Sequence, residues 1–364
     1  MPKSKEKIEA QDEGVVCSLE GTRGGLKAIN LALQGGGAHG AFAWGVLDKI
    51  LEDGRIDIEG ISGASAGSMN AVVLAHGISK GGREGAREAL HNFWEAISET
   101  GQRYNPIRRM PWETMLYGSK SDNSWAYTWF KLMVASFSPY QFNPFDFNPL
   151  RDVLESQVNF ERLNQCQSVK LFLSATNIRT GKVKVFRTEN ITAEVVLASA
   201  CLPSLFKAVQ IDDQYYWDGG YMGNPVLFPF FNHTKARDIM IVHINPLERD
   251  SLPRLVDEID DRLNEITFNA SLLKEFRAIA FVHKLIDQGW LKDEYRDKLK
   301  YILVHSIRAD MALGEFSLAS KFDCSWDFLM LLRDRGREAA GEWLHRHFDD
   351  IGQRSTVDIR REFS

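Results

Sequence analysis

Two short glycine-rich segments contain the residue types that ester hydrolysis requires. The first, Gly35-Gly36-Gly37-Ala38-His39-Gly40, offers closely spaced backbone N–H groups that can bind a developing oxyanion. The second, Gly63-Ala64-Ser65-Ala66-Gly67, places a serine between small residues where an apolar strand meets a helix. A sharp turn of this kind needs small neighbours, because a larger side chain would clash with the adjacent backbone. We therefore predict Ser65 as a nucleophile, with an oxyanion hole formed by Gly35, Gly36, Gly37 and Ala38.

The hydroxyl of Ser65 needs a base, because a serine is a weak nucleophile until its proton is removed. Asp218 follows the aromatic run Tyr215-Tyr216-Trp217 and precedes two glycines. This pattern predicts a carboxylate at the end of a strand. Partial desolvation by the aromatic neighbours would raise its pKa and make it a stronger base. We expect Asp218 to accept the proton of Ser65 and later to activate water, a reaction for which we predict no cofactor and no metal ion.

Strands and helices must hold these residues in place. The apolar run 28–33 predicts a strand before the glycine segment, and 38–53 has the pattern of a helix that stops at Gly54. A second strand over 56–62 leads to Ser65, and helical sequence follows it. This order predicts parallel strands joined by right-handed crossovers. Further strands are expected at 170–176, 183–187, 239–244 and 301–305, and long helical stretches at 252–288 and 323–348.

Aromatic residues are dense between Phe93 and Phe142, where the helical pattern loosens. We interpret this stretch as an insertion into the strand-and-helix order. Tryptophan and tyrosine favour interfaces, so residues 104–142 could form a lid or a membrane contact. Packing within the core is the other interpretation, and both stay open at this point.

Composition limits the classes of partner. The chain has 364 residues, 44% of them hydrophobic and 26% charged, with a net charge of -5 and a pI near 6.0. These values are ordinary for a globular protein and give no basic field for nucleic acid. The four cysteines have no C-x-x-C spacing, which argues against a disulfide framework or a zinc site.

The expected compartment follows from the absence of two kinds of apolar segment. The polar N-terminal sequence has no signal-peptide core, and no run of about 18 apolar residues predicts a transmembrane helix. We expect a cytoplasmic protein and leave open a transient, peripheral contact with a membrane surface. Homo-oligomerisation is also left open.

Five segments resemble the patatin-like phospholipase family in their order and spacing. They are the two glycine-rich segments, Asp218-Gly219-Gly220, and the blocks 175–181 and 198–206. The resemblance implies a three-layer α/β/α fold with a mostly parallel central sheet, a Ser–Asp dyad without histidine, and lipid acyl hydrolysis as a phospholipase A or lysophospholipase. It also implies supporting roles for Gly63, Gly67, Gly219 and Gly220. His39 departs from the pattern, because the family commonly carries Arg or Lys at that position.

The resemblance also implies a division of the chain. We expect a flexible N-terminal extension over residues 1–26 and a patatin-like catalytic domain over residues 29–229. Residues 230–364 are expected to complete the sheet and to add helices at the C-terminal end. The preferred function is a serine lipid acyl hydrolase that cleaves carboxylic esters of lipids or phospholipids.

Three other interpretations are kept beside this one. Gly35, Gly37 and Gly40 also match the G-x-G-x-x-G pattern of dinucleotide-binding loops, with Asp57 at a suitable spacing. An α/β-hydrolase would add a histidine to the serine and the aspartate, and four histidines follow Asp218: His233, His243, His283 and His305. A non-catalytic lipid-binding or effector protein could keep the same fold.

Overall fold

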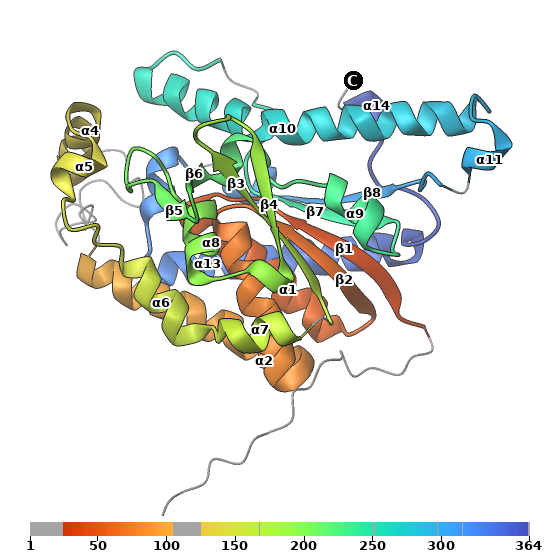
Figure 1. Cartoon of the computed structure of the whole chain (residues 1–364), viewed down its shortest axis with the longest axis horizontal. Coiled ribbons are helices and arrows are strands. Elements are labelled where there is room, and N and C mark those ends of the chain that lie inside the picture. Colours follow the sequence, from red (N-terminus) through yellow and green to blue (C-terminus); the bar gives the residue numbers. More distant parts are fainter. Residues whose placement is uncertain are drawn as a thin grey trace, which may run out of the picture.

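The computed structural model describes residues 25–104, 125–166, 168–249, 252–296, 298–314 and 316–362. Within these residues, one sheet of eight strands runs through the middle of the molecule (Figure 1). The strands are β1 (Lys27–Leu33), β2 (Ile56–Gly63), β3 (Lys170–Asn177), β4 (Val183–Arg187), β5 (Val209–Ile211), β6 (Gln214–Asp218), β7 (Asp238–His243) and β8 (Leu303–Arg308). Their order is β5-β6-β3-β2-β1-β7-β8, with β4 paired to β3.

The sheet is mostly parallel. Strands β3, β2, β1, β7 and β8 run in one direction, whereas β4 and β6 are antiparallel to β3, and β5 is antiparallel to β6. The carboxyl ends of the parallel strands therefore meet at one edge, where α/β proteins place their ligand sites.

Helices cover both faces of the sheet. The lower face in Figure 1 carries α1 (Gly40–Asp53), α2 (Ala66–Tyr104), α6 (Pro149–Gln157), α8 (Ala193–Ser199) and α13 (Trp326–His347), and the upper face carries α9 (Phe228–His233), α10 (Val256–Asp287) and α14 (Ile359–Glu362). Side chains of β7 alternate between two cores, with Met240 and Val242 in the lower one and Ile239 and Ile241 in the upper one. The predicted three-layer α/β/α fold is confirmed.

Short helices connect the main elements. They are α4 (Trp125–Ser136), α5 (Pro139–Phe142), α7 (Phe160–Gln165), α11 (Asp293–Arg296) and α12 (Asp310–Leu313), with the 3₁₀ turns η1 (Gly37–His39), η3 (Thr188–Asn190), η4 (Gly219–Tyr221), η5 (Leu318–Phe322) and η6 (Phe348–Asp350). Two of these turns, η1 and η5, pack against each other although they lie far apart in the sequence.

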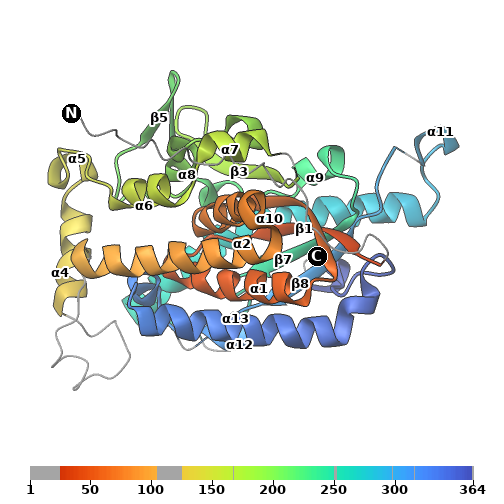
Figure 2. The same ribbon diagram turned by 90° about the horizontal axis from the view of Figure 1, so that it is seen from below.

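The helical C-terminal part packs against the helix that follows the glycine segment. Helices α1 and α13 lie side by side in Figure 2. They approach closely at two glycines, because a Cβ on Gly45 would collide with the carbonyl oxygen of Arg333 and a Cβ on Gly336 would collide with that of Phe42. We call the segment 35–40 the glycine loop. The C-terminal helix α13 thus supports α1, the helix that follows this loop.

The predicted insertion begins later than Phe93. Helix α2 continues to Tyr104 after a break at Gly81 and Gly82, and Phe93, Trp94 and Ile97 are buried. Their spacing keeps one helical face towards the core, so the expectation of an insertion starting at Phe93 is wrong.

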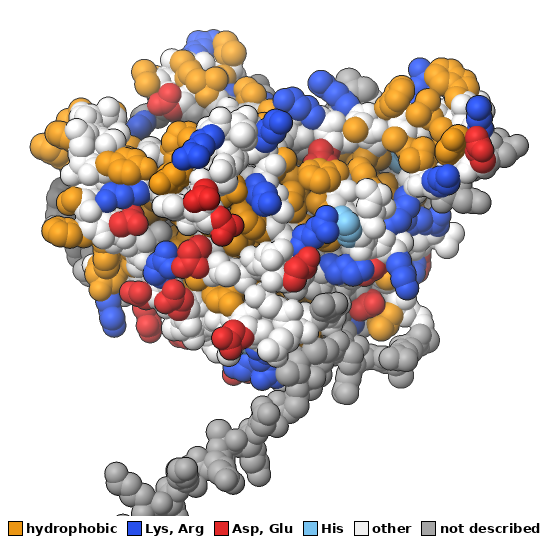
Figure 3. Space-filling view, viewed as in Figure 1, with side chains coloured by type: hydrophobic (Ala, Val, Ile, Leu, Met, Phe, Trp, Pro, Cys, Tyr) orange, Lys and Arg blue, Asp and Glu red, His pale blue; other side chains and the backbone are white. Residues whose placement is uncertain are grey.

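The rest of the aromatic stretch divides into two parts. Residues 105–124 lie outside the described ranges, and with them most of the region predicted as a lid or a membrane contact. Beyond them, Tyr140, Phe145 and Phe147 are exposed, with 93% of Phe145 accessible. Hydrophobic side chains gather over α4 and α5 in Figure 3. Core packing therefore does not explain these aromatics, and a lid or surface contact stays a prediction.

Several other predictions concern the chain ends and the membrane. Residues 1–24 of the predicted extension, and Cys17 with them, lie outside the described ranges. Of the cysteines in the described part, Cys201 and Cys324 are free thiols. None of the helices in the described ranges combines the length and the hydropathy needed to cross a bilayer.

Candidate active site

Ser65 occupies a sharp turn between β2 and α2. Strand β2 ends at Gly63, α2 begins at Ala66, and Ser65 has a positive φ of 53°. A non-glycine residue adopts this conformation uncommonly, and strained positions of this kind cluster at functional sites. Gly63 and Gly67 are sterically required, because a Cβ on Gly63 would lie 2.7 Å from the backbone of Gly67, and one on Gly67 would collide with the carbonyl oxygen of Leu33.

The turn is anchored by the last residue of α8. The backbone N–H of Ser65 donates to both the carbonyl oxygen and the hydroxyl oxygen of Ser199, each at 3.1 Å. The Ser199 hydroxyl also pairs with that of Ser68 at 2.7 Å. Ser199 lies in the block 198–206 that resembles the family, but its contact with Ser65 was not predicted.

Asp218 ends β6 and is completely buried. Its backbone N–H donates to the carbonyl oxygen of Cys201 at 2.8 Å, and its own carbonyl oxygen accepts the hydroxyl of Thr176 at 2.8 Å. Strand β6 pairs with β3 so that Asp218 lies opposite Ala175. The blocks 175–181 and 198–206 therefore both fix the position of Asp218.

Burial has the largest effect on the pKa of the Asp218 carboxyl and raises it to about 7. The backbone N–H of Gly220, which donates to Oδ1 at 2.6 Å, opposes this rise. The Ser65 hydroxyl and the positive charge of Lys321 also lower the pKa. Oδ2 has no hydrogen-bond partner of normal geometry among the described residues, so it is left available to Ser65. A carboxylate with a pKa near neutrality is a suitable general base.

Gly219 and Gly220, which follow Asp218, lie in close contact with neighbouring residues. A Cβ on Gly219 would collide with the carbonyl oxygen of Ser174, and one on Gly220 would lie 2.9 Å from Oδ1 of Asp218 and against the ring of Phe268. Both positions therefore exclude a side chain for steric reasons.

The glycine loop lies directly against Ser65. A Cβ on Gly35 would be 2.5 Å from that of Ser65. The backbone N–H of Gly35 donates to Oδ1 of Asn224 at 2.7 Å and is therefore not free to bind an oxyanion. The N–H groups of Gly36 and Gly37 have no partner among the described residues. One of the four residues predicted to form the oxyanion hole, Gly35, thus uses its N–H group in another hydrogen bond.

A buried group of four amide side chains holds this loop; we call Gln34, Asn224, Asn245 and Asn269 the amide cluster. Gln34 accepts the backbone N–H groups of Ile244 and Asn245 at 2.8 and 3.0 Å and donates to Asn269 at 3.0 Å. Asn245 donates in turn to the carbonyl oxygen of Gly35 at 2.9 Å. The amide cluster was not predicted, although Gln34 directly precedes the glycine segment.

An apolar cavity of about 260 Å³ opens beside Ser65. Gly37 and Ala38 border it near the serine, and Lys321 is the one charged residue among the described residues that line it. Apolar side chains from α2, from the start of α6 and from the loop after α8 form most of the wall: Met69, Phe93, Trp94, Ile97, Leu150, Leu202, Leu205 and Phe206. A cavity of this kind suits an acyl chain.

The histidines do not join Ser65 and Asp218. All nine lie in the described part of the chain, and none of them forms a hydrogen bond with either residue. His305 does pair with a carboxylate, Asp238, at 2.9 Å, but Asp238 begins β7 and lies at the edge of the sheet opposite the serine. The arrangement gives no support to a Ser-His-Asp triad.

The dinucleotide interpretation also lacks a geometric basis. Asp57 is the second residue of β2, so it lies at the far end of that strand from the glycine loop. A dinucleotide-binding fold needs its acidic residue near the loop, where it meets the ribose.

The family model described as patatin-like phospholipase matches residues 31–230, more than half of the chain. No protein of curated function matches the sequence.

Solved structures to which the chain is similar include VipD from Legionella pneumophila, which is 17% identical with a TM-score of 0.41, over 93% of this chain and 72% of VipD. The type III effector protein ExoU is 14% identical with a TM-score of 0.34, over 88% of this chain and 53% of that one. The ExoU–SpcU complex from the type III secretion system of Pseudomonas aeruginosa contains a chain that is 15% identical with a TM-score of 0.35. That match covers 96% of this chain and 61% of the other. The chain thus spans between half and two thirds of the matched chains in the ExoU structures.

The match to the family model covers Ser65, Asp218 and the glycine loop together. The chain belongs to the patatin-like phospholipase family.

Proposed function

We propose that the protein is a serine lipid acyl hydrolase that cleaves carboxylic esters of lipids or phospholipids. The observation that carries the proposal is Ser65 at a positive φ, with its hydroxyl next to a fully buried Asp218 and in the wall of an apolar cavity. A nucleophile, a base and an acyl-binding slot are the three parts that the reaction requires.

Acylation begins when Oγ of Ser65 attacks the ester carbonyl carbon and Asp218 accepts the hydroxyl proton. The carbonyl oxygen becomes an oxyanion, which the N–H groups of Gly36, Gly37 and Ala38 stabilise. Gly35 supports this loop through its bond to Asn224 instead of binding the oxyanion itself. Collapse of the intermediate breaks the bond to the alcohol oxygen, and Asp218 returns the proton to the leaving alcohol.

Deacylation repeats these steps with water. Asp218 accepts a proton from the water molecule, whose oxygen attacks the acyl carbon of the Ser65 ester. The second intermediate collapses with release of the fatty acid, and the proton returns to Oγ of Ser65.

The proposal extends to the rest of the chain. Residues 29–229 act as the catalytic domain, and residues 230–364 complete the sheet and supply supporting contacts. The partner is a lipid or ester substrate, met at a membrane surface from the cytoplasm, and the exposed aromatic residues Tyr140, Phe145 and Phe147 fit such a contact.

Fatty acid release from phospholipid and lysophospholipid vesicles tests the proposal. The wild-type protein should release fatty acid, whereas Ser65→Ala and Asp218→Asn should reduce release by at least about 1,000-fold. Ser62→Ala removes a buried serine three residues away, and Asp213→Asn removes an exposed carboxylate close to β6. Both controls should keep wild-type activity. Lipid binding without fatty acid release by the folded wild type would favour the non-catalytic alternative.

A further inference from the structure

The glycine loop has no positive charge of its own. His39 is its one ionisable side chain, and burial, together with the nearby charge of Lys321, lowers the pKa of His39 to about 3. Its Nε2 atom pairs with the hydroxyl of Ser320 at 2.7 Å. The imidazole is therefore neutral at physiological pH and fixes η1 against η5, rather than supplying charge to the site.

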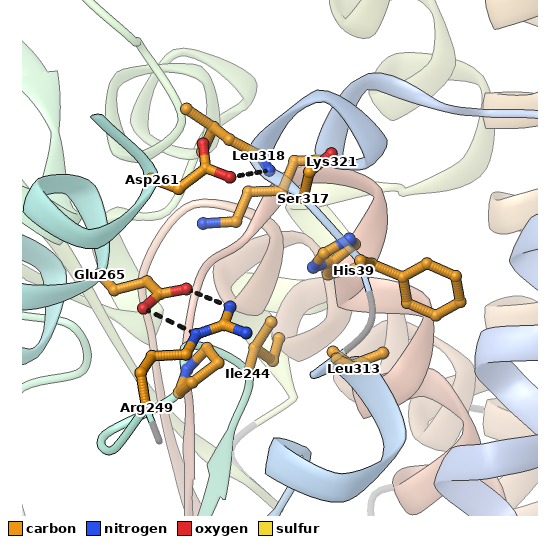
Figure 4. A pocket seen from close by; sticks show the side chains of 11 residues that line it. His39, Ile244, Arg249, Asp261, Glu265, Leu313, Ser317, Leu318 and Lys321 are labelled. Atoms are coloured by element: carbon orange, nitrogen blue, oxygen red, sulfur yellow. Dashed lines mark hydrogen bonds and ion pairs between the residues drawn. The ribbon is translucent and has the colours of Figure 1, made fainter. Parts of the chain in front are cut away.

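Lys321 follows Ser320 and brings a cation to the same place. Figure 4 shows its side chain extending from η5 towards Asp261 and Glu265 of α10. Its ammonium group donates to Oδ1 of Asn245 at 2.9 Å and to Oδ1 of Asn264 at 3.2 Å. Two side-chain hydrogen bonds thus fix the position of this charge.

The contact with Asn245 links Lys321 to the glycine loop. Asn245 accepts from Lys321 through its oxygen and donates through its nitrogen to the carbonyl oxygen of Gly35 at 2.9 Å. The backbone of Lys321 also touches the loop, because a Cβ on Gly37 would lie 2.5 Å from the Lys321 carbonyl oxygen. One residue from the C-terminal part of the chain therefore contacts the loop at two points.

We propose that Lys321 is a positioning residue of the site, which holds the glycine loop through Asn245 and brings a buried positive charge to the wall of the cavity beside Ser65. This inference rests on the proposed function, because it gives Lys321 a part in the reaction of Ser65 and Asp218.

The charges around the two groups support this assignment. Lys321 lowers the pKa of Asp218, and Asp218 in turn raises that of Lys321. Burial lowers the pKa of Lys321 to about 8; Arg249 acts in the same direction, whereas Glu265 and Asp261 oppose it. The other ionisable groups close to Asp218 are Cys201 and Tyr221, each with a pKa raised to about 12 by burial. Cys201 and Tyr221 are neutral between pH 5 and 9, so of the described groups that act on Asp218 in this range, Lys321 is the one whose charge changes.

The account predicts a pH profile with two limbs. The reaction of Ser65 with a fluorophosphonate should become faster as Asp218 loses its proton near pH 7. It should become slower as Lys321 loses its proton near pH 8, because a neutral amine bonds less strongly to Asn245 and holds the glycine loop less firmly. A residue that only fills space would produce no alkaline limb.

Phosphonylation of Ser65 by a fluorophosphonate probe, in which Oγ bonds to phosphorus and fluoride leaves, tests the inference when its rate is followed over pH. Lys321→Met should move the acid limb up by about one pH unit and abolish the alkaline limb, with about a fivefold lower rate at pH 7. Lys321→Arg should keep the acid limb and lose only the alkaline one. Lys300→Met is the matched control, since Lys300 donates to the carbonyl oxygens of Phe230 and Thr234 near the opposite edge of the sheet. A Lys321→Met profile that superimposes on the wild type would overturn the inference.

Asn264→Asp provides a second variant in case Lys321→Met does not fold. A carboxylate at this position would stabilise the charged ammonium group, so the alkaline limb should move up by on the order of one pH unit. An unchanged limb would contradict the role of Lys321.

A titration of Asp218 separates this inference from the proposed function. ¹³C NMR of protein labelled at the aspartate carboxyl carbons reports the Asp218 pKa without catalysis, and Asp218→Asn identifies the signal. A higher pKa in Lys321→Met supports the inference even where the wild type fails to react with the probe, and such a failure counts against the proposed function alone. An unchanged pKa overturns the inference.

Discussion

The backbone N–H of Ser65 is held by Ser199, which accepts it through both its carbonyl oxygen and its hydroxyl at 3.1 Å. The turn carries Ser65, and these two bonds attach it to the C-terminal end of α8. The Ser199 hydroxyl is also the partner of Ser68, so one side chain stabilises two positions of the turn.

Ser199→Ala should destabilise the protein by about 1–3 kcal/mol, because it leaves the buried hydroxyl of Ser68 without this partner. Urea denaturation measures the change. Ser156→Ala removes a hydroxyl that bonds to Val153 on the more exposed helix α6 and should cost less. Equal stability of the Ser199 variant and the wild type would show that these hydrogen bonds do not hold the turn.

Gly35→Ala should reduce the rate at which a fluorophosphonate probe labels Ser65 by on the order of 100-fold, because the new Cβ would displace the serine. The Cβ would lie 2.5 Å from that of Ser65. Gly81→Ala is a suitable control, since a Cβ there has nothing within 4 Å. The rate of probe labelling checks the prediction, and a Gly35→Ala variant as reactive as the control would contradict the described contact.

Ile97→Trp should shorten the acyl chain that the site accepts. Ile97 lines the cavity beside Ser65, so a larger side chain removes space from the apolar slot. The ratio of kcat/KM for long-chain to short-chain p-nitrophenyl esters should fall by about tenfold or more. Ile266→Trp makes the same change at an exposed position of α10 and should leave the ratio unaltered. If both variants keep the wild-type ratio, the cavity does not bind the acyl chain.

His243→Phe should make the stability less sensitive to acid. Burial lowers the pKa of His243 to about 3, and neither ring nitrogen has a hydrogen-bond partner among the described residues. As the pH falls below 6.5 the unfolded chain takes up a proton that the folded chain refuses, so the free energy of unfolding decreases by up to about 1.4 kcal/mol per pH unit. The His243→Phe variant does not show this decrease in the free energy of unfolding.

The difference in unfolding free energy between pH 7 and pH 5 should therefore be up to about 2 kcal/mol smaller in His243→Phe than in the wild type. Asp218 and Glu275 have raised pKa values of about 7 and act in the opposite direction, because their folded forms take up protons first as the pH falls. Both proteins share these groups, so the comparison isolates His243. An exposed control, His345→Phe, should retain the wild-type pH dependence.

The parts of the candidate site that lie in short local motifs could be proposed from the sequence. Ser65, Asp218 and the glycine loop are recognisable because a sharp turn demands small neighbours at fixed spacing. The layers of the fold followed from the order of apolar strands and helices. The helical end of α2 was missed because aromatic residues at helical spacing were interpreted as an insertion.

The supporting residues could not be predicted because tertiary contacts alone define them. Asn245 and Lys321 reach the glycine loop from beyond residue 230, and single amide or lysine residues have no local signature. The hydrogen bond between Gly35 and Asn224 is equally invisible in the sequence, although it decides which N–H groups stay free.

Fluorophosphonate labelling followed by peptide mapping tests the central claim most directly. The account predicts one label on Ser65 in the wild type, none on Ser65→Ala, and strongly slowed labelling of Asp218→Asn at pH 7. An unlabelled wild-type protein that is well folded, or a label on another serine, would contradict the assignment of Ser65 as the nucleophile and Asp218 as its base.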